Sequence, residues 1–334
     1  MLNQIKIKIM QKPIVETNFQ IPGLTKIHTG KVRDVYQTDR GHLISVVTDR
    51  ISAFDEVLPA GIPYKGQVLN QIASRFLDEA VEHFICPTWK VSEIHPMVTA
   101  GIKAKPYMVE IIVRGYVTGS LYRDIYSQGG REICGIELPD GMKEFEKFPK
   151  PIVTPTTKAE SGHDENISPD EIIARGLATI EEYELMADYA LELFSMGTAF
   201  AAERGLILVD TKYEFGIDDE GMIILIDEIH TPDSSRYWYE EGYMESFKAG
   251  KSPKSLDKEF VRQWLIKQGF KGDPGQEMPY IPEAFVEVIS NLYMELYQNV
   301  MGEELQQTEY SLEEIEMAII NFMEGVEDLE STNK

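Results

Sequence analysis

The sequence has few cysteines and no long apolar segment. Cys86 and Cys134 are its only cysteines and lack the close spacing of metal ligands, so we expect two separate thiols rather than a disulfide or a zinc site. No apolar run approaches the ~20 residues that a membrane span requires. Residues 1–13 alternate lysine with apolar residues, unlike the continuous apolar core of a signal peptide. These absences predict a cytoplasmic protein.

The sequence is also poor in basic residues. It has 32 Lys and Arg against 56 Asp and Glu, which gives a formal net charge of −24. Nucleic acids and anionic membranes would be repelled by most of such a surface, so we expect neither as a partner. Its 334 residues, 43% of them hydrophobic, are enough for two domains. Any anionic ligand would need a local pocket of lysine and arginine.

Two apolar runs in the second half of the chain predict a β-hairpin. They lie at 206–209 and 222–226 and are separated by glycines and an acidic turn, which is typical of antiparallel strands. Side chains alternate across a strand, so Asp210, Lys212 and Glu214 share one face. The hairpin therefore presents a row of charged groups.

The return strand of this hairpin brings Asp227 and Glu228 back to the end that carries Glu214. Carboxylate oxygens suit Mg²⁺, which keeps its other positions for water and nucleotide oxygens. A solvated polar face is the alternative. The polar loop 230–238 follows and ends near Arg236. Its donors suit an anionic ligand, and binding groups concentrate in such loops.

A β-meander is predicted at residues 24–49. Its first turn carries GKVRD, in which Gly30 precedes Lys31 and Arg33 at alternate positions. Glycine lets the backbone approach a triphosphate closely, and the two cations would meet its charge. An ordinary tight turn with solvated cations is the alternative, because a single glycine is a weak signal.

Two loops present further polar residues. Residues 48–66 hold several prolines and glycines, and for Asp55 and Lys65 we expect a supporting role in a site. Residues 151–168 are polar and form either a surface excursion or a lid. The candidate lid residues are Lys158, His163 and Asp164.

A buried strand is predicted at 107–113, and it leads into a glycine-rich turn with Arg114 and Ser120. Such a strand suits the hinge of a nucleotide site, whose backbone reads the adenine edge. Glu110 interrupts the apolar run, and a charge on an edge strand is the alternative reading of it. A guanidinium and a hydroxyl in a glycine-rich turn suit a phosphate.

Helical periodicity predicts helices at 68–84 and at 180–204, and three more after residue 250. Helices packed on antiparallel strands indicate the α+β class. We expect an antiparallel β-rich nucleotide-binding domain at 1–110 and an α+β domain with the metal and substrate site at 111–250. Residues 251–334 would form a helical appendage packed on the body.

Six blocks resemble those of the SAICAR synthetase (phosphoribosylaminoimidazole-succinocarboxamide synthase) family. In order they are GKVRD, TDRISAFD, PYKG, VRGYVTGS, PTTK with HDENIS, and DTKYEFG with DEIHTPDSSR. Each block is short, but their joint order over residues 24–240 is very specific. The resemblance implies a SAICAR synthase-like fold, with an antiparallel N-terminal ATP-binding domain and a larger α+β domain with C-terminal helices.

The resemblance also implies the reaction. The family ligates L-aspartate to the carboxylate of carboxyaminoimidazole ribotide (CAIR), with ATP, to give SAICAR, ADP and phosphate in purine biosynthesis. A carboxylate reacts with an amine only after its oxygen becomes a leaving group, so an acyl phosphate is expected. ATP, L-aspartate and CAIR are thus the expected partners and Mg²⁺ the cofactor, in a monomer or a homo-oligomer.

The resemblance implies three groups of site residues. The ATP-binding group is Gly30, Lys31, Arg33, Glu110 and Lys212. The metal ligands are Glu214 and Asp227. The ribotide-binding group is Arg114, Ser120, Arg236 and Asp233. Two of these would be catalytic, Lys212 by neutralising the transferring phosphoryl group and Asp233 by orienting the aminoimidazole.

Two other functions stay open from the sequence. A small-molecule or lipid kinase would share the glycine hairpin, the hinge strand and the carboxylate metal site. The sequence has no H-R-D-x-x-x-x-N and no D-F-G motif, which argues against a protein kinase. A non-catalytic nucleotide-binding module would tolerate loss of Glu214 or Asp227. Neither function explains anion-binding arginines at both Arg114 and Arg236.

Overall fold

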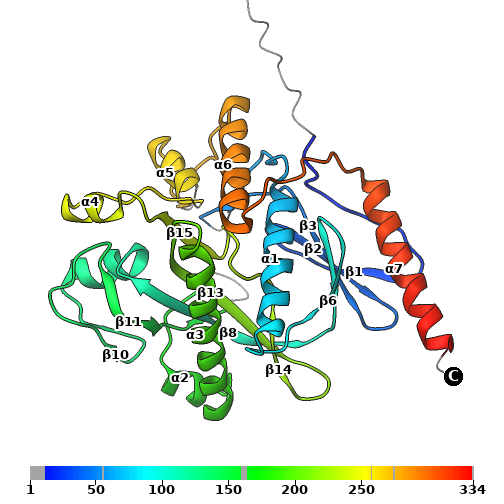
Figure 1. Ribbon diagram of the computed structural model, residues 1–334, viewed down its shortest axis with the longest axis horizontal. Helices are drawn as coiled ribbons and strands as arrows, with labels where there is room; N and C mark the ends of the chain where they lie inside the picture. Colours follow the sequence, from blue (N-terminus) through cyan, green and yellow to red (C-terminus); the bar gives the residue numbers. More distant parts are fainter. Residues whose placement is uncertain (1–11, 55, 159–163, 257, 274, 333–334) are drawn as a thin grey trace, which may run out of the picture.

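The computed structural model describes residues 12–54, 56–158, 164–256, 258–273 and 275–332. Two antiparallel sheets and a layer of helices build the fold (Figure 1). The expected α+β class is confirmed. In the described part of the chain, no helix is long and apolar enough to cross a membrane.

The first sheet has the strand order β1-β2-β3-β7-β6, and all its neighbours are antiparallel. Its strands are β1 (Leu24–Thr29), β2 (Arg33–Thr38), β3 (Leu43–Val47), β6 (Lys90–His95) and β7 (Val98–Gly101). The predicted meander is confirmed as β1 to β3. A two-stranded hairpin follows it, made of β4 (Ser52–Ala53) and β5 (Glu56–Val57).

The second sheet has the order β11-β8-β13-β14, with β12 also paired to β8 and β15 to β13. Its strands are β8 (Lys105–Tyr116), β11 (Lys147–Val153), β12 (Thr156–Thr157), β13 (Leu206–Ile217), β14 (Ile223–Ile226) and β15 (Ser235–Tyr239). The predicted hairpin is confirmed, with Glu214 opposite Ile226. Strand β8 lies between β11 and β13, so the alternative of Glu110 as an edge-strand charge is wrong.

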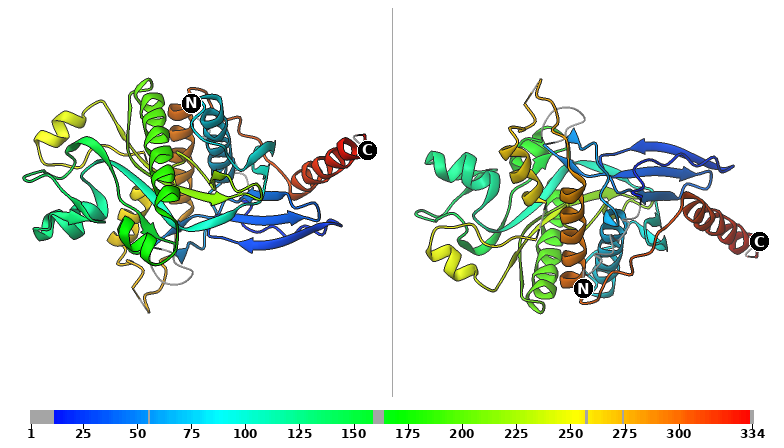
Figure 2. Two further views of the ribbon diagram at one scale, coloured as in Figure 1. Left: turned by 90° about the horizontal axis from the view of Figure 1, so that it is seen from below. Right: turned by 90° about the horizontal axis from the view of Figure 1, so that it is seen from above.

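Helices cover the two sheets. They are α1 (Lys65–Glu82), α2 (Pro169–Ala174), α3 (Ile180–Ala202), α4 (Tyr243–Lys248), α5 (Glu259–Lys267), α6 (Glu283–Met301) and α7 (Leu312–Thr332). Short turns of helix at Leu121–Ile125 and Tyr126–Gln128 precede a small hairpin, β9 (Glu132–Ile133) with β10 (Ile136–Glu137). Helices α1, α3 and α6 lie side by side in one layer (Figures 1 and 2).

Helix α7 packs on the first sheet, away from that layer (Figure 2). Side-chain alternation along β3 explains why the sheet has two different faces. Ile44 is buried in a core that includes Ile315 and Ile319 of α7, whereas Leu43 and Ser45 face a pocket on the other side. The expected division at residues 110 and 250 stays a prediction, and residue 110 lies within β8.

A buried histidine holds the loop between β14 and β15. The His230 ring makes a 2.7 Å hydrogen bond with the Tyr213 hydroxyl, and the backbone carbonyl of His230 accepts a 2.8 Å hydrogen bond from the Tyr237 hydroxyl. Helix α3 passes close to this ring at Gly197, where an added Cβ would lie 2.4 Å from a ring carbon. Only glycine leaves room for the ring, so this contact fixes the loop that starts at Asp227.

We expect Gly197→Ala to destabilise the protein by about 1–3 kcal/mol, because the new methyl group forces the histidine ring or the helix to move. Urea denaturation at pH 7 measures the change. Gly325→Ala is the matched control, since this exposed glycine of α7 has no atom within 4 Å of the added Cβ. The control should be neutral or stabilised by up to ~1 kcal/mol. Equal midpoints for the wild type and Gly197→Ala would contradict the packing argument.

Candidate functional site

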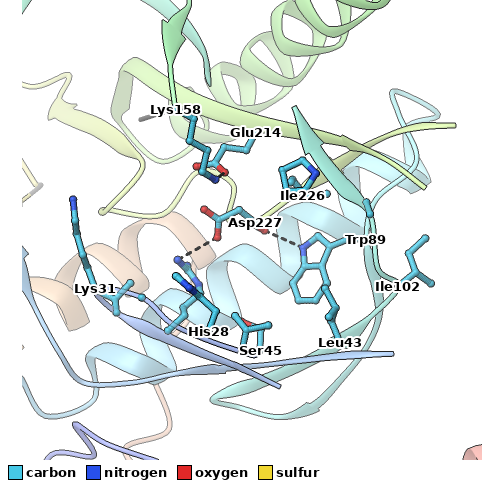
Figure 3. A pocket seen from close by; sticks show the side chains of 16 residues that line it. His28, Lys31, Leu43, Ser45, Trp89, Ile102, Lys158, Glu214, Ile226 and Asp227 are labelled. Carbon is cyan, nitrogen blue, oxygen red and sulfur yellow. Dashed lines mark hydrogen bonds and ion pairs between the residues drawn. The ribbon is translucent and has the colours of Figure 1, made fainter. Parts of the chain in front are cut away.

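The first of two adjoining pockets is an apolar slot between the two sheets. It encloses about 430 Å³. Its apolar lining consists of Val32, Val35, Leu43, Trp89, Ile102, Ala104, Pro106 and Ile226. Strands β2 and β3 supply one wall and β14 the opposite wall, and the Trp89 ring lies at one end (Figure 3). The shape and lining suit a flat aromatic ring such as a nucleobase.

The other end of this pocket is polar. Gly30 and Lys31 belong to the turn between β1 and β2 and line the pocket. The Gly30 N–H donates to the Arg33 carbonyl at 2.7 Å, and Arg50 donates to the Gly30 carbonyl at 3.0 Å. These bonds hold the turn over the slot, with the Lys31 side chain beside it (Figure 3).

Two carboxylates, Glu214 and Asp227, also point into the polar end (Figure 3). Asp227 has a positive φ of 62°, a conformation that costs energy for any residue other than glycine. The Trp89 indole N–H donates to its carbonyl at 3.0 Å. A hydrogen-bonded backbone therefore holds Asp227 in this unfavourable conformation.

Each carboxylate at this end faces a cation. The guanidinium of Arg33 lies 3.3 Å from Asp227 Oδ1 and 2.6 Å from a carboxylate oxygen of Glu228. The ammonium groups of Lys158 and Lys212 both contact Glu214. Burial alone would raise the pKa of Glu214, but the two lysines outweigh burial and lower it to about 2. Burial raises the pKa of Asp227 despite Arg33.

The second pocket is smaller, at about 250 Å³, and the lysines and arginines in its lining outnumber the aspartates. Asp210 on β13 brings two arginines of neighbouring strands together, with Arg114 at 3.6 Å and Arg236 at 3.5 Å. Gly119 has a positive φ of 60°, and a Cβ there would lie 2.2 Å from the guanidinium of Arg236. The glycine-rich turn thus passes directly against this arginine and adds Ser120 to the pocket lining.

Lys212 connects the two pockets. It lines the second pocket, while its ammonium donates to Glu110 at 2.8 Å and contacts Glu214 of the first pocket. Lys212 and Glu214 are two residues apart on β13 and share a face, as the alternation predicts. Despite burial, the neighbouring carboxylates raise the pKa of Lys212, so its ammonium stays charged.

The structure groups the predicted site residues in and beside the two pockets. Those that line the first pocket are Gly30, Lys31, Arg33, Lys158, Glu214 and Asp227. Those that line the second are Arg114, Ser120, Lys212, Asp233 and Arg236. The individual roles of these residues stay predictions.

The other predicted residues line neither pocket or fall outside the described residues. Glu110 contacts Lys212 but lines neither pocket, so its ATP-binding role stays a prediction. Asp164 is exposed and lines neither pocket. Asp55 and His163 fall outside the described residues.

Sequence reasoning missed several lining residues. Trp89 and Ile102 of the apolar slot belong to no motif, because apolar residues of this kind occur throughout a core. Lys258 and Arg262 line the second pocket, yet they belong to a stretch whose only sequence signal was helical periodicity. Lys65 is the lysine of the PYKG motif, and a supporting role was expected for it. Its ammonium donates to Asp233 at 2.9 Å.

An apolar slot with a charged end, joined by a lysine to a pocket with two arginines, is typical of an enzyme that uses a nucleotide to act on a phosphorylated small molecule. Comparison with known proteins narrows this class. The SAICAR synthetase family model matches residues 26–278. The phosphoribosylaminoimidazole-succinocarboxamide synthase of Bacteroides thetaiotaomicron is 56% identical over 315 residues, which are 93% of this chain and 99% of that protein.

Solved structures show the same relationship. SAICAR-synthase from Saccharomyces cerevisiae complexed with SAICAR is 33% identical with a TM-score of 0.75, covering 87% of this chain and 99% of that one. A SAICAR synthetase in complex with ADP is 25% identical with a TM-score of 0.65, covering 84% and 100%. The chain belongs to the SAICAR synthetase family.

The chain is therefore an ATP-dependent carbon–nitrogen ligase of purine biosynthesis, which joins L-aspartate to CAIR and forms SAICAR, ADP and phosphate. The resemblance found in the six sequence blocks is confirmed. The kinase alternative is not favoured, because the relatives and the solved structures are SAICAR synthases.

His230 gives this site loop a pH-dependent stability. Burial lowers the pKa of His230 from 6.5 to about 3, so between these values the unfolded chain binds a proton that the folded chain does not. The free energy of unfolding should then rise with pH across this window, by about 1.4 kcal/mol per pH unit for one proton. In His230→Gln this contribution is absent.

Urea denaturation at several pH values from 4 to 6 tests this prediction. The slope of the unfolding free energy against pH should be smaller in His230→Gln than in the wild type by about 1.4 kcal/mol per pH unit, which corresponds to one proton. The variant is expected to be less stable at every pH, so the slope and not the midpoint is the readout. Equal slopes in the two proteins would contradict the prediction, because they would show that His230 binds a proton in the folded protein as it does in the unfolded chain.

Proposed function

We propose that ATP occupies the first pocket and that the ribotide occupies the second, with the transferred phosphoryl group beside Lys212. The apolar slot suits adenine, and the turn at Gly30 and Lys31 suits the triphosphate. Arg114 and Arg236 suit the ribotide phosphate, because planar guanidinium groups bind phosphate oxygens in pairs. The observation that carries the proposal is that Lys212 lines the second pocket while it contacts Glu214 of the first.

Glu214 and Asp227 would hold Mg²⁺. In the described part of the chain, no group of three or more His, Cys, Asp or Glu side chains is arranged to hold a metal. Two carboxylates at the phosphate end of a nucleotide pocket nevertheless fit Mg²⁺, which is usually bound by one or two carboxylates plus water and phosphate oxygens. When bound, the ion would neutralise charge on the β- and γ-phosphates.

The residues then act mainly by position and charge. A carboxylate oxygen of CAIR attacks the γ-phosphorus of ATP, which gives an acyl phosphate and ADP. The amine of L-aspartate next attacks the acyl carbon, and the carbon–oxygen bond to phosphate breaks as the amide forms. Lys212 would neutralise the developing charge on the phosphoryl oxygens. Asp233 would accept a hydrogen bond from the aminoimidazole and hold the reacting carboxylate in place.

Lys158 would close the nucleotide end as part of a lid. It follows β12, lines the first pocket and contacts Glu214 across it. An ammonium in this position can meet a phosphate oxygen once Glu214 binds a cation. This role would explain why Lys158, which belongs to a polar loop, lines the nucleotide pocket.

We expect Glu214→Gln and Asp227→Asn each to lower kcat at least a hundredfold, because a neutral amide binds Mg²⁺ far more weakly than a carboxylate. The measurement is ADP formation at rising Mg²⁺ concentrations, with circular dichroism as the check on folding. Glu220→Gln, in the exposed turn of the same hairpin, is the matched control and should be unchanged. A folded and fully active variant would remove its residue from the metal site.

Arg236→Ala should raise the KM for the ribotide about ten- to a hundredfold, because the variant loses one charge-assisted hydrogen bond to the phosphate. The KM for ATP should stay within twofold of the wild type. Steady-state kinetics with each substrate varied in turn measures both values, and Arg123→Ala at an exposed position is the control. Equal increases in both KM values would place the arginine outside the ribotide pocket.

A further inference from the structure

The carboxylate of Asp233 is held by two donors from distant parts of the chain. The Tyr293 hydroxyl donates to Oδ1 at 2.7 Å, and the Lys65 ammonium donates to Oδ2 at 2.9 Å. The same ammonium lies 5.3 Å from the centre of the Tyr293 ring, within the range of a cation–π contact. The three side chains therefore contact one another in a closed triangle.

The triangle is buried, yet one of its members faces a pocket. Tyr293 is 2% exposed and Lys65 is fully buried, whereas Asp233 lines the second pocket. Lys65 and Tyr293 are thus inaccessible to a ligand and act through Asp233. Each carboxylate oxygen has two lone pairs, so both oxygens of Asp233 can still accept a hydrogen bond from a ligand in the pocket.

Both donors are fixed by the packing of their helices. Lys65 is the first residue of α1, and the N–H of the next residue, Gly66, donates to the buried Asp49 at 2.9 Å. Ser290, one turn before Tyr293 on α6, donates to the Pro63 carbonyl at 2.8 Å. The start of α1 and the middle of α6 are therefore joined directly behind Asp233.

The donors also decide the charge of Asp233. Burial without partners would raise the pKa of this carboxyl and neutralise it. Lys65 and Lys258 outweigh burial and, with the Tyr293 hydrogen bond, hold the pKa well below its usual value. An ionised carboxylate accepts hydrogen bonds and cannot donate one, so it favours a ligand with an N–H donor over a ligand with an acceptor at the same place.

We propose that Tyr293 is a positioning residue for ribotide recognition. Together with Lys65 it holds Asp233 ionised and aimed at the exocyclic amine of the aminoimidazole. This inference rests on the proposed placement of the ribotide in the second pocket. A ribotide with that amine donates a further hydrogen bond to Asp233, whereas an analogue without it leaves one remaining acceptor position of this desolvated carboxylate empty, which is disfavoured.

The proposal gives the C-terminal part of the chain a role in the site. Tyr293 lies beyond residues 26–278, the segment that matches the family model. Helix α6 packs beside α1 in the main helical layer (Figure 1). From this helix, Tyr293 contacts Asp233 on the side away from the second pocket. The matched segment alone therefore lacks the Tyr293 donor to Asp233.

The test is the kinetics of Tyr293→Phe, which keeps the ring and removes only the hydroxyl. We expect the KM for the ribotide to rise about tenfold, as for the loss of one hydrogen bond to a charged group. The KM for ATP, kcat and the thermal midpoint should change little. Tyr297→Phe is the matched control, because Tyr297 is a buried tyrosine one turn further along α6 and lines neither pocket. It should leave the ribotide KM unchanged.

A second variant separates this inference from the proposed function. Asp233→Asn should also raise the ribotide KM. If it does not, the placement of the ribotide at Asp233 is wrong. If Asp233→Asn raises the ribotide KM and Tyr293→Phe does not, only the positioning role of Tyr293 is overturned. A parallel rise of the ribotide and ATP KM values in Tyr293→Phe, with a lower thermal midpoint, would show a structural role and also overturn it.

Discussion

The pairing of carboxylates with lysine and arginine between the two sheets is the interaction on which the rest of the structure depends. The protein is strongly acidic, yet it places Arg33, Lys158 and Lys212 against Asp227, Glu228 and Glu214 in the narrow space where the sheets meet. These side chains are buried or partly buried, so removing one partner leaves a poorly solvated charge without its counter-ion, which destabilises the protein. When a nucleotide, a metal ion and an anionic substrate bind, they would replace the present ion-pair partners of these same side chains. Stability and substrate binding therefore involve the same ion pairs.

Strand β13 carries this arrangement because its side chains alternate. Tyr213 and Phe215 are fully buried in the main core, and Lys212 and Glu214 point the opposite way toward the pockets. The core residues fix the height and register of the strand, so the lysine and the carboxylate reach the junction of the two pockets without depending on a flexible loop. The backbone on the other side of the junction is strained at Asp227 and held by Trp89. Such rigid placement suits a reaction in which position and charge supply most of the catalysis.

Sequence reasoning predicted the parts whose signals are local. The hairpin of β13 and β14, the meander and the long helices follow from apolar periodicity and turn residues, and the six motifs identified the family. What it did not predict depends on contacts between distant segments. Trp89 looks like any core aromatic until β14 lies beside it, and Tyr293 has no motif around it. The contact of Glu110 with Lys212 was not predicted either, because only the strand register shows which neighbour a side chain meets. Local patterns therefore gave the elements, the motifs gave most of the charged residues that line the pockets, and the packing of α5 and α6 on the site came only from the structure.

In the proposed arrangement the two pockets meet so closely that the γ-phosphoryl group passes directly to the ribotide carboxylate. The most direct test is one turnover with CAIR labelled with ¹⁸O in that carboxylate, in the presence of ATP and L-aspartate. One labelled oxygen should leave with the phosphate and the other should stay in the new amide, since the acyl phosphate is cleaved between carbon and oxygen. Mass analysis of the released phosphate measures this transfer. Phosphate without label, with ADP and SAICAR formed as usual, would rule out direct transfer, because the phosphoryl group would then never have been bonded to the substrate.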